Sequence, residues 1–320
     1  MTAVTLALAG DTMLGRKVAE AIDRNGPESV FADEVIALTR SADLFVLNLE
    51  CCISSRGTPW PDPRKPFFFR APPKATEVLT RLGVDCVSLA NNHALDFDRA
   101  ALLDTLEHLR EAGIDWVGAG RTVQEARAPT TLERNGFRLS VIGCSDHPAD
   151  YAAGPTRPGI AYVDPRRGVE WLPDAIAGLD ADAVLVTPHW GPNMNPEPLP
   201  YVQWAAAALR EAGATLVAGH SAHVFQGVEP GILYDLGDFV DDYAVDGKRR
   251  NDLGLLFFVT LDKEGPSRVE AVPLKLEYCH TRLADGEDAA WIRGRFRAAC
   301  AGLGTEVAEE DGRLVVDWRP

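Results

Sequence analysis

Apolar positions along the chain fall into short runs that alternate with amphipathic segments. Runs typical of buried strands occupy residues 4–10, 43–49, 84–90, 132–145, 181–191 and 214–223. Segments with helical periodicity lie near 14–24, 31–40, 72–83, 98–113 and 199–212; in the fourth, Leu102, Leu103, Leu106 and Leu109 share one face. This alternation predicts an α/β protein, a mixed sheet with helices outside it.

The last third of the chain has a different rhythm. Strand-like runs at 231–239, 253–262 and 268–277 follow one another, before a helical segment near 287–300 and a run at 313–318. They predict a second sheet packed on the first. Asn135-Gly136 between two apolar runs predicts a hairpin. Since no linker or repeat divides the 320 residues, we expect residues 1–320 to form a single domain.

Five predicted strands end in the same kind of residue. The ends carry Asp11, Glu50, Asn91-Asn92-His93, His189, and His220 with His223. Ligands of open α/β sheets bind outside the carboxyl ends of strands, so these side chains are expected to meet in one crevice. Taken singly, each has a plainer interpretation, since Asp11 could cap a helix and a lone histidine could be a core polar group.

Carboxylate, amide and imidazole groups together indicate a divalent cation. Without a thiolate in the set, the donors suit Ca, Mg, Mn or Zn rather than a soft metal. The sequence therefore predicts one or two metal ions at this edge of the sheet.

Net charge and hydropathy argue against several classes of binding partner. The formal net charge is −15, from 32 Lys plus Arg against 47 Asp plus Glu, which argues against nucleic acid and makes a long polyanion an awkward substrate. The amino terminus lacks the pattern of a signal peptide, and no run reaches the roughly 18 apolar residues of a membrane span. We expect a cytoplasmic protein with no membrane partner, and its six cysteines reduced and structural.

Several motifs resemble one known family. GDTMLGR (10–16), NLE (48–50), FRAPP (69–73), SLANNHALD (88–96), HWG (189–191), GHSAH (219–223) and LGDF (236–239) look like the CapA, or poly-γ-glutamate capsule synthesis, family. This family is a branch of the calcineurin-like metallophosphoesterase fold. The resemblance implies a four-layer α/β/β/α sandwich whose metal site lies at the carboxyl-terminal edge of the strands.

The resemblance also implies roles for individual residues. His93 matches the histidine that acts near the reacting group. Met13 stands where the wider superfamily has a ligand histidine, and Asp238 stands where this branch usually has Asn. The positions that match metal ligands are Asp11, Glu50, Asn92, His189, His220 and His223.

Two reactions fit these parts. A cation can activate a water molecule for hydrolysis, with His93 as the acid/base group and Asp96 either fixing its tautomer or merely charging the first turn of the next helix. Alternatively, a polarised peptide carbonyl acidifies its Cα–H, and two proton-handling groups invert that centre. The second group would be a histidine such as His220, with Asp238, while Asp11 could assist His93.

We favour epimerisation near the carboxylate end of a peptide, as in CapA-like epimerases encoded with lasso-peptide genes. Hydrolysis of an amide or phosphoester, a role in capsule polymer synthesis, and a non-catalytic scaffold are the alternatives. The candidate substrate-binding residues are Arg70, Arg16, Asn91 and Trp190. Arg70 could clamp a carboxylate or phosphate, or simply pair with an acid.

Overall fold

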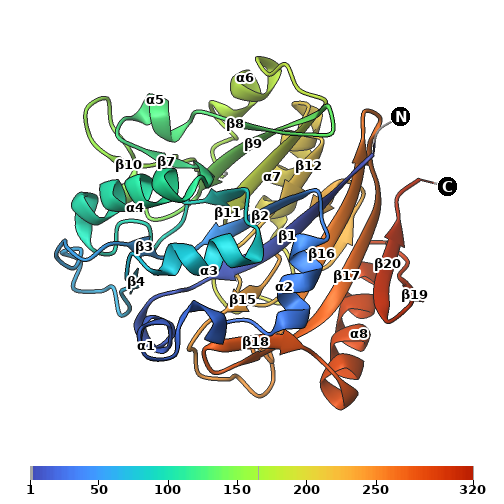
Figure 1. Ribbon diagram of the computed structural model, residues 1–320. Helices are drawn as coiled ribbons and strands as arrows, with labels where there is room; N and C mark the ends of the chain where they lie inside the picture. Colours follow the sequence, from blue (N-terminus) through green and yellow to red (C-terminus); the bar gives the residue numbers. More distant parts are fainter. Residues whose placement is uncertain (1–2, 165, 320) are drawn as a thin grey trace.

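Two β-sheets face each other in the computed structural model, which describes residues 3–164 and 166–319 (Figure 1). The first sheet has the strand order β19 (Ala308–Glu310), β20 (Arg313–Asp317), β17 (Gly265–Glu277), β16 (Leu253–Asp262), β1 (Val4–Thr12), β2 (Leu44–Leu49), β5 (Cys86–Ser88) and β6 (Asp115–Val117). In addition, β15 (Asp238–Val240) pairs with β1, and β18 (His280–Leu283) pairs with β17.

The second sheet has six strands. Their order is β13 (Val228–Glu229), β14 (Ile232–Leu233), β12 (Leu216–Ala218), β11 (Ala183–His189), β9 (Phe137–Ser145) and β8 (Thr130–Arg134). The β8–β9 hairpin turns at Asn135-Gly136, as the sequence predicts. Short strand pairs join β3 (Cys52–Ile53) to β4 (Arg70–Ala71) and β7 (Ala119–Gly120) to β10 (Gly159–Ile160).

Helices cover the outer faces of both sheets. The first sheet is covered by α1 (Arg16–Asn25), α2 (Asp33–Arg40), α3 (Ala75–Leu82) and α4 (Asp98–Ala112), and the second by α6 (Leu172–Ala177) and α7 (Pro200–Glu211). The remaining helices are α5 (Val123–Ala126), α8 (Gly286–Ala301) and the 3-10 turns η1 (Pro27–Ser29) and η2 (Ala149–Tyr151).

Alternation along β1 shows how the layers are held together. Leu6 and Leu8 point into the core between the sheets, while Ala7 and Ala9 belong to the core under the helices. The inter-sheet core also takes Ile292 from α8. The predicted four-layer α/β/β/α arrangement is thus confirmed; the single domain stays a prediction.

Two strand predictions are wrong in extent. The run 214–223 is a strand only over Leu216–Ala218, because Ser221 and His223 have φ angles of 110° and 57°, which no strand allows. The run 231–239 is divided between β14 and β15, which lie in different sheets. The sequence also gave no sign of the short strands β18 and β19.

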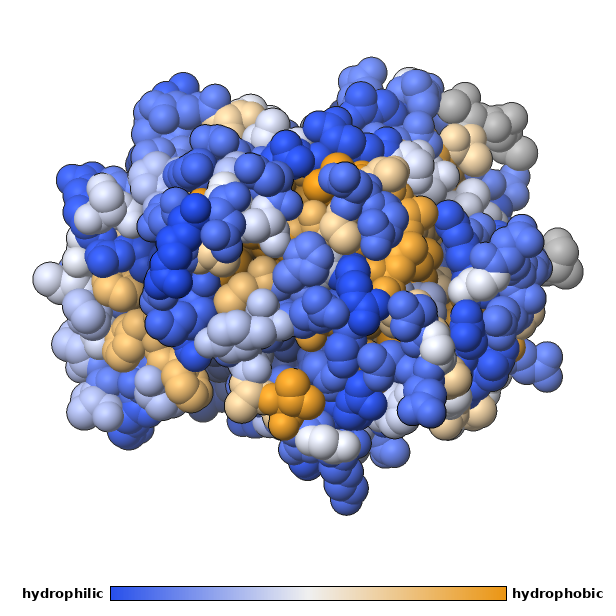
Figure 2. All heavy atoms as spheres, turned by 60° about the horizontal axis from the view of Figure 1, so that its bottom comes forward, coloured by the Kyte–Doolittle hydropathy of each residue, from blue (hydrophilic) through white to orange (hydrophobic). Residues whose placement is uncertain are grey.

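Surface character agrees with the composition. Viewed from below, hydrophilic side chains cover most of the molecule, and apolar ones show between them near the middle of the face (Figure 2). None of the helices described here has the length and apolar character needed to cross a bilayer. The six cysteines are buried and unpaired in the described structure, and burial raises the pKa of Cys51 to about 12.

Candidate metal centre

The central strand β1 brings its carboxyl end between two parallel neighbours. Asp11 pairs in register with Asn48 of β2 on one side and with Asp238 of β15 on the other. Gly10 allows this close approach, since a Cβ there would lie 1.8 Å from the carbonyl oxygen of Gly237. The backbone N–H of Asp11 donates to that oxygen at 2.8 Å. Parallel pairing therefore places polar residues from distant segments at one edge of the sheet.

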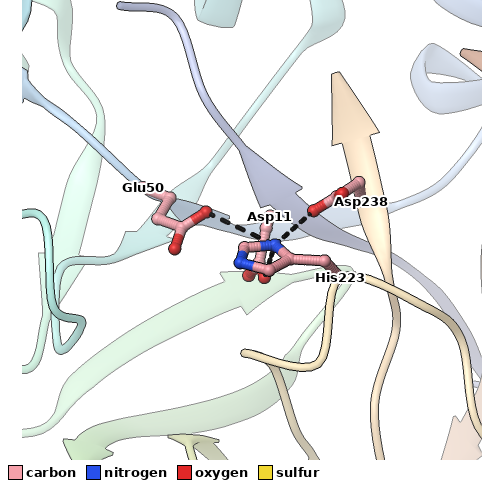
Figure 3. Close-up of side chains that lie close together, drawn as sticks. All are labelled: Asp11, Glu50, His223 and Asp238. Atoms are coloured by element: carbon pink, nitrogen blue, oxygen red, sulfur yellow. Dashed lines mark hydrogen bonds and ion pairs between the residues drawn. The ribbon is translucent and has the colours of Figure 1, made fainter. Parts of the chain in front are cut away.

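Four side chains form a compact buried group at this edge (Figure 3). Asp11, Glu50, His223 and Asp238 each offer one ligand atom, and these atoms all lie within 4.8 Å of one another. The Nδ1 atom of His223 is 2.8 Å from Asp238 Oδ1, 3.3 Å from Asp11 Oδ2 and 4.0 Å from Glu50 Oε2. Three carboxylates and one imidazole around one point are a donor set for a single divalent cation.

Two further histidines from the predicted ligand set border this group. His220 Nδ1 is 3.7 Å from Asp11 Oδ1, and its Nε2 is 2.8 Å from Thr187 Oγ1. His189 reaches within 4.0 Å of both Asp11 and Glu50. If His220 uses Nε2 for the hydrogen bond to Thr187, its Nδ1 lone pair faces the carboxylates.

Unsatisfied buried atoms test whether a cation fits. Both carboxylate oxygens of Glu50, Oδ2 of Asp238, Oδ1 of Asn92 and Nδ1 of His220 are buried without a hydrogen-bond partner in the part of the chain that the structure describes. Buried polar atoms are normally paired, and each unpaired one costs roughly 1–3 kcal/mol. A cation at the four-residue group would satisfy the atoms of Glu50, Asp238 and His220, so these residues fit the metal that the sequence predicts.

Electrostatics at the group also favour a positive ion. Burial, followed by the charge of Asp11, raises the pKa of Glu50 well above its usual value. Burial and the Asp241 carboxylate raise the pKa of Asp238 in the same way. Burial lowers the pKa of His220 to about 4, which keeps it neutral and able to act as a ligand.

The loop that carries His220 and His223 is strained. Ser221 and His223 have positive φ angles although neither is glycine. The loop is held by hydrogen bonds from the backbone N–H of Ser221 to Asp11 (3.2 Å) and of Ala222 to Asp235 (2.8 Å). Strain of this kind is found where a side chain must be aimed at a functional point.

His93 stands next to the group, held by its own carboxylate. Its Nδ1 is 2.6 Å from Asp96 Oδ2, and its Nε2 is 3.9 Å from Glu50 Oε1. The ring of Phe69 stacks on the imidazole with a centroid distance of 3.8 Å. Although Asp96 favours the charged imidazole, burial is the larger effect and lowers the pKa of His93 to about 4.

Asp96 is fully buried and accepts several hydrogen bonds. Its Oδ2 also accepts the backbone N–H of Phe69 at 2.6 Å, and its Oδ1 binds Lys65 Nζ at 2.9 Å and the Tyr151 hydroxyl at 3.1 Å. These donors hold the carboxylate of Asp96 in a fixed position beside His93. Asp96 is therefore more than a charge in the first turn of α4.

The four candidate substrate-binding residues have varied positions. Asn91 is buried and bridges Asn48 to the backbone of Leu49 and His93, and Trp190 donates Nε1 to the carbonyl of Tyr234. Arg70 stacks on Phe97 and donates to the carbonyl of Arg56. Arg16 binds Asp242 at 3.1 Å and lies over Phe69. Asn91 therefore contacts His93 directly, and Arg16 lies near Phe69, whose ring stacks on that of His93.

Comparison with known proteins gives the family. The family described as "Bacterial capsule synthesis protein PGA_cap" matches residues 5–243. The chain belongs to this family. The resemblance found in the motifs is therefore confirmed.

Individual PGA_cap relatives are moderately similar. "PGA biosynthesis protein CapA" of Bacillus subtilis is 28% identical over 85% of this chain and 72% of its own length. "Probable polyglutamine synthesis accessory protein" of Mycobacterium tuberculosis is 29% identical over 98% and 95%. Among solved structures, a 5'-nucleotidase precursor from Thermus thermophilus has a TM-score of 0.46 at 12% identity, over 86% of this chain and 55% of its own.

Three positions of this PGA_cap chain add detail to the predicted site. Asn48 donates to Asp11 Oδ1 at 2.7 Å; it belongs to the motif NLE and is a polar residue inside the buried run of β2, but it was not among the predicted site residues. Asp238 lies in the four-residue group that could hold a metal ion, and its acid/base role stays a prediction. Met13, at the position where the resemblance implies a ligand histidine in the wider superfamily, is fully buried.

Proposed function

We propose that this PGA_cap protein is a metal-dependent enzyme that hydrolyses an amide bond in a peptide-like chain. The observation that carries the proposal is the His93–Asp96 pair, which lies outside the four-residue metal group. The Nε2 atom of His93 lies 3.9 Å from Oε1 of Glu50, a member of that group. Hydrolysis needs one such proton-handling group beside a metal. An amide substrate is supported by relatives named for PGA biosynthesis and polyglutamine synthesis.

Each residue has a defined task in this proposal. Asp11, Glu50, His223 and Asp238 would hold the cation, with His189 and His220 beside them; Asn92 stays a candidate ligand from the sequence. A bound divalent cation supplies Lewis acidity for a carbonyl and lowers the pKa of water. His93 moves a proton at Nε2, because Asp96 engages its Nδ1. The stacked Phe69 ring keeps the imidazole in this orientation.

Epimerisation of a peptide residue is the second candidate, and one contact favours it. His223 and Asp238 form another close histidine–aspartate pair. His223 faces Oε2 of Glu50, whereas His93 faces Oε1. If other residues held the ion, this pair would supply the second proton-handling group that inversion needs.

Incubation of the metal-loaded enzyme with peptides in deuterated water distinguishes the two reactions. Hydrolysis predicts shorter fragments, whereas epimerisation predicts one deuteron at a Cα in an intact chain, both read by mass spectrometry. Either product should disappear with a chelator and return with added Mn²⁺. Deuterium without fragments would reject the first candidate, and activity that survives the chelator would reject both.

Replacing the proton carrier should slow turnover while the metal stays bound. His93→Gln is expected to lower kcat by about 10²–10⁴-fold, the usual contribution of general acid–base catalysis, with metal content unchanged. His108→Gln is the matched control, since His108 lies on α4 and pairs with Glu111. Wild-type kcat in the His93 variant would show that another group moves the proton.

A further inference from the structure

Two surface pockets beside the metal centre share one residue that the motifs do not include. The first has a volume of about 530 Å³ and lies between the segments that follow β9 and β11. The second, of about 320 Å³, lies between the loop before β4 and the segment after β9, and Asn92 is part of its wall. His147 lines both pockets. The ring of His147 lies 5.3 Å from that of His189, so the pockets meet at the edge of the metal centre.

His147 is held in a fixed orientation. Its Nδ1 is hydrogen-bonded to Asp146 Oδ1, while Asp146 Oδ2 accepts the backbone N–H of Gly191 at 3.0 Å and the Tyr201 hydroxyl at 3.2 Å. A carboxylate with three partners is an anchor, not a solvated surface charge. Since Nδ1 is used, Nε2 is the nitrogen left to bind a ligand, and the side chain is 34% exposed.

The walls of the two pockets do not suit a polyanion. Four acids line them, against three cations, Arg64, Lys65 and Arg166. Arg64 is paired with Asp62 and Lys65 with Asp96, while Arg166 lies over the ring of Tyr201. A row of carboxylates would therefore meet repulsion along this path.

The same walls suit a chain with amide groups and apolar side chains. Trp60 and Tyr151 line the second pocket with their rings 4.7 Å apart, and Tyr201 lines the first. Ligand pockets typically combine such apolar walls with a few fixed polar groups. Here the fixed polar group is the imidazole of His147, placed between the two pockets.

We infer that His147 is a substrate-binding residue, whose Nε2 forms a hydrogen bond with a backbone amide of an extended, uncharged peptide chain lying across both pockets. Side chains on either side of the reacting amide occupy one pocket each. The inference rests on the proposed function in that it names the substrate class of the same site. It separates that class from polyglutamate.

Binding of two defined probes tests the inference. The Mn²⁺-loaded protein would be titrated into fluorescently labelled octamers, and the anisotropy of the label would report binding. The first probe is a mixture of octapeptides composed of Ala, Ser, Phe and Tyr with blocked ends. The second probe is an octamer of γ-linked glutamate. The peptides are expected to bind at least tenfold more tightly. His147→Ala should weaken peptide binding about fivefold to tenfold, the usual effect of one lost hydrogen bond.

Controls separate binding from folding and from catalysis. His108→Ala should bind as wild type, and Trp60→Ala should weaken peptide binding through the other pocket wall without touching His147. Metal content and the thermal midpoint of each variant show whether it is folded and loaded. Wild-type affinity in the His147 variant, or tighter binding of the glutamate octamer, would overturn the inference.

The two proposals can fail separately. Peptide binding that depends on His147 but yields neither fragments nor deuterated peptide would leave the binding site standing and reject the proposed function. If His147→Ala turns over substrate with an unchanged KM, the proposed function stands and the binding role of His147 is rejected.

Discussion

At the scale of single residues, Glu50 shows how function and stability oppose each other. Its carboxylate is fully buried, and neither oxygen has a hydrogen-bond partner in the described structure. Without a cation, the folded state must hold this charge close to Asp11 in a place that water does not reach. The residue therefore destabilises the metal-free protein and contributes to stability only with an ion.

Glu50→Gln should have opposite effects in the two states. At pH 8 in chelator, the variant is expected to melt about 2–4 °C above wild type, since an unpaired buried charge is removed. Its affinity for Mn²⁺ should fall at least about tenfold, because a ligand loses its charge. Scanning calorimetry and metal titration measure both. The matched control is Glu107→Gln on the surface of α4, where neither quantity should change.

Some residues of the site could be predicted from the sequence and others could not. Strand ends have a fixed direction, so Asp11, Glu50 and His223 could be placed together from the pattern of runs alone. Arg70 begins the two-residue strand β4, which is too short to show a period, so the sequence could not tell where its side chain points; it stacks on Phe97. His147 matched no motif, so only the fold reveals that it adjoins His189.

At the scale of elements, the contact between β1 and the segment before β15 fixes the metal group. Asp11 and Asp238 are register partners only because Gly10 lets the backbone of Gly237 approach. The helices and longer strands followed from hydrophobic periodicity. The two- and three-residue strands did not, because so few residues establish no period, and β14 and β15 were merged into one run.

Gly10→Ala is therefore expected to disrupt both packing and metal binding. The new methyl group would overlap the carbonyl oxygen of Gly237, so β15 must move and the free energy of unfolding should fall by about 3 kcal/mol or more. Gly294→Ala, on α8 with no atom within 4 Å of the added Cβ, should instead gain about 0.5–1 kcal/mol. Urea denaturation compares them; a Gly10 variant as stable as wild type would show that β15 can relax.

At the scale of the whole molecule, the raised pKa values of buried acids predict the pH dependence of stability. Burial raises the pKa of Glu50, Asp235 and Asp238 in the folded metal-free protein. Their stabilising contribution is present below the unfolded pKa near 4 and is lost as pH rises through the folded pKa. Histidines such as His93, with a pKa lowered to about 4, have the opposite effect: their contribution to stability is present above about pH 6.5 and is lost as pH falls below it.

The metal-free protein should therefore lose thermal stability as pH rises through the raised pKa values of these acids, while the metal-loaded protein should not. The difference between their melting temperatures should grow with pH, and metal binding should release protons. Calorimetric titration with Mn²⁺ in two buffers of different ionisation enthalpy counts the protons. A difference that shrinks as pH rises would contradict the raised pKa values.

The pairing of β1 also sets an order of events during synthesis. All the candidate ligands precede residue 243, the end of the family match, yet residues 4–8 of β1 pair with β16, whose residues begin at 253. Until the ribosome has released β16, one edge of β1 stays unpaired. Unpaired apolar strand edges can pair with other chains and so promote aggregation. A nascent chain that already contains every ligand is thus still unable to complete the sheet that carries them.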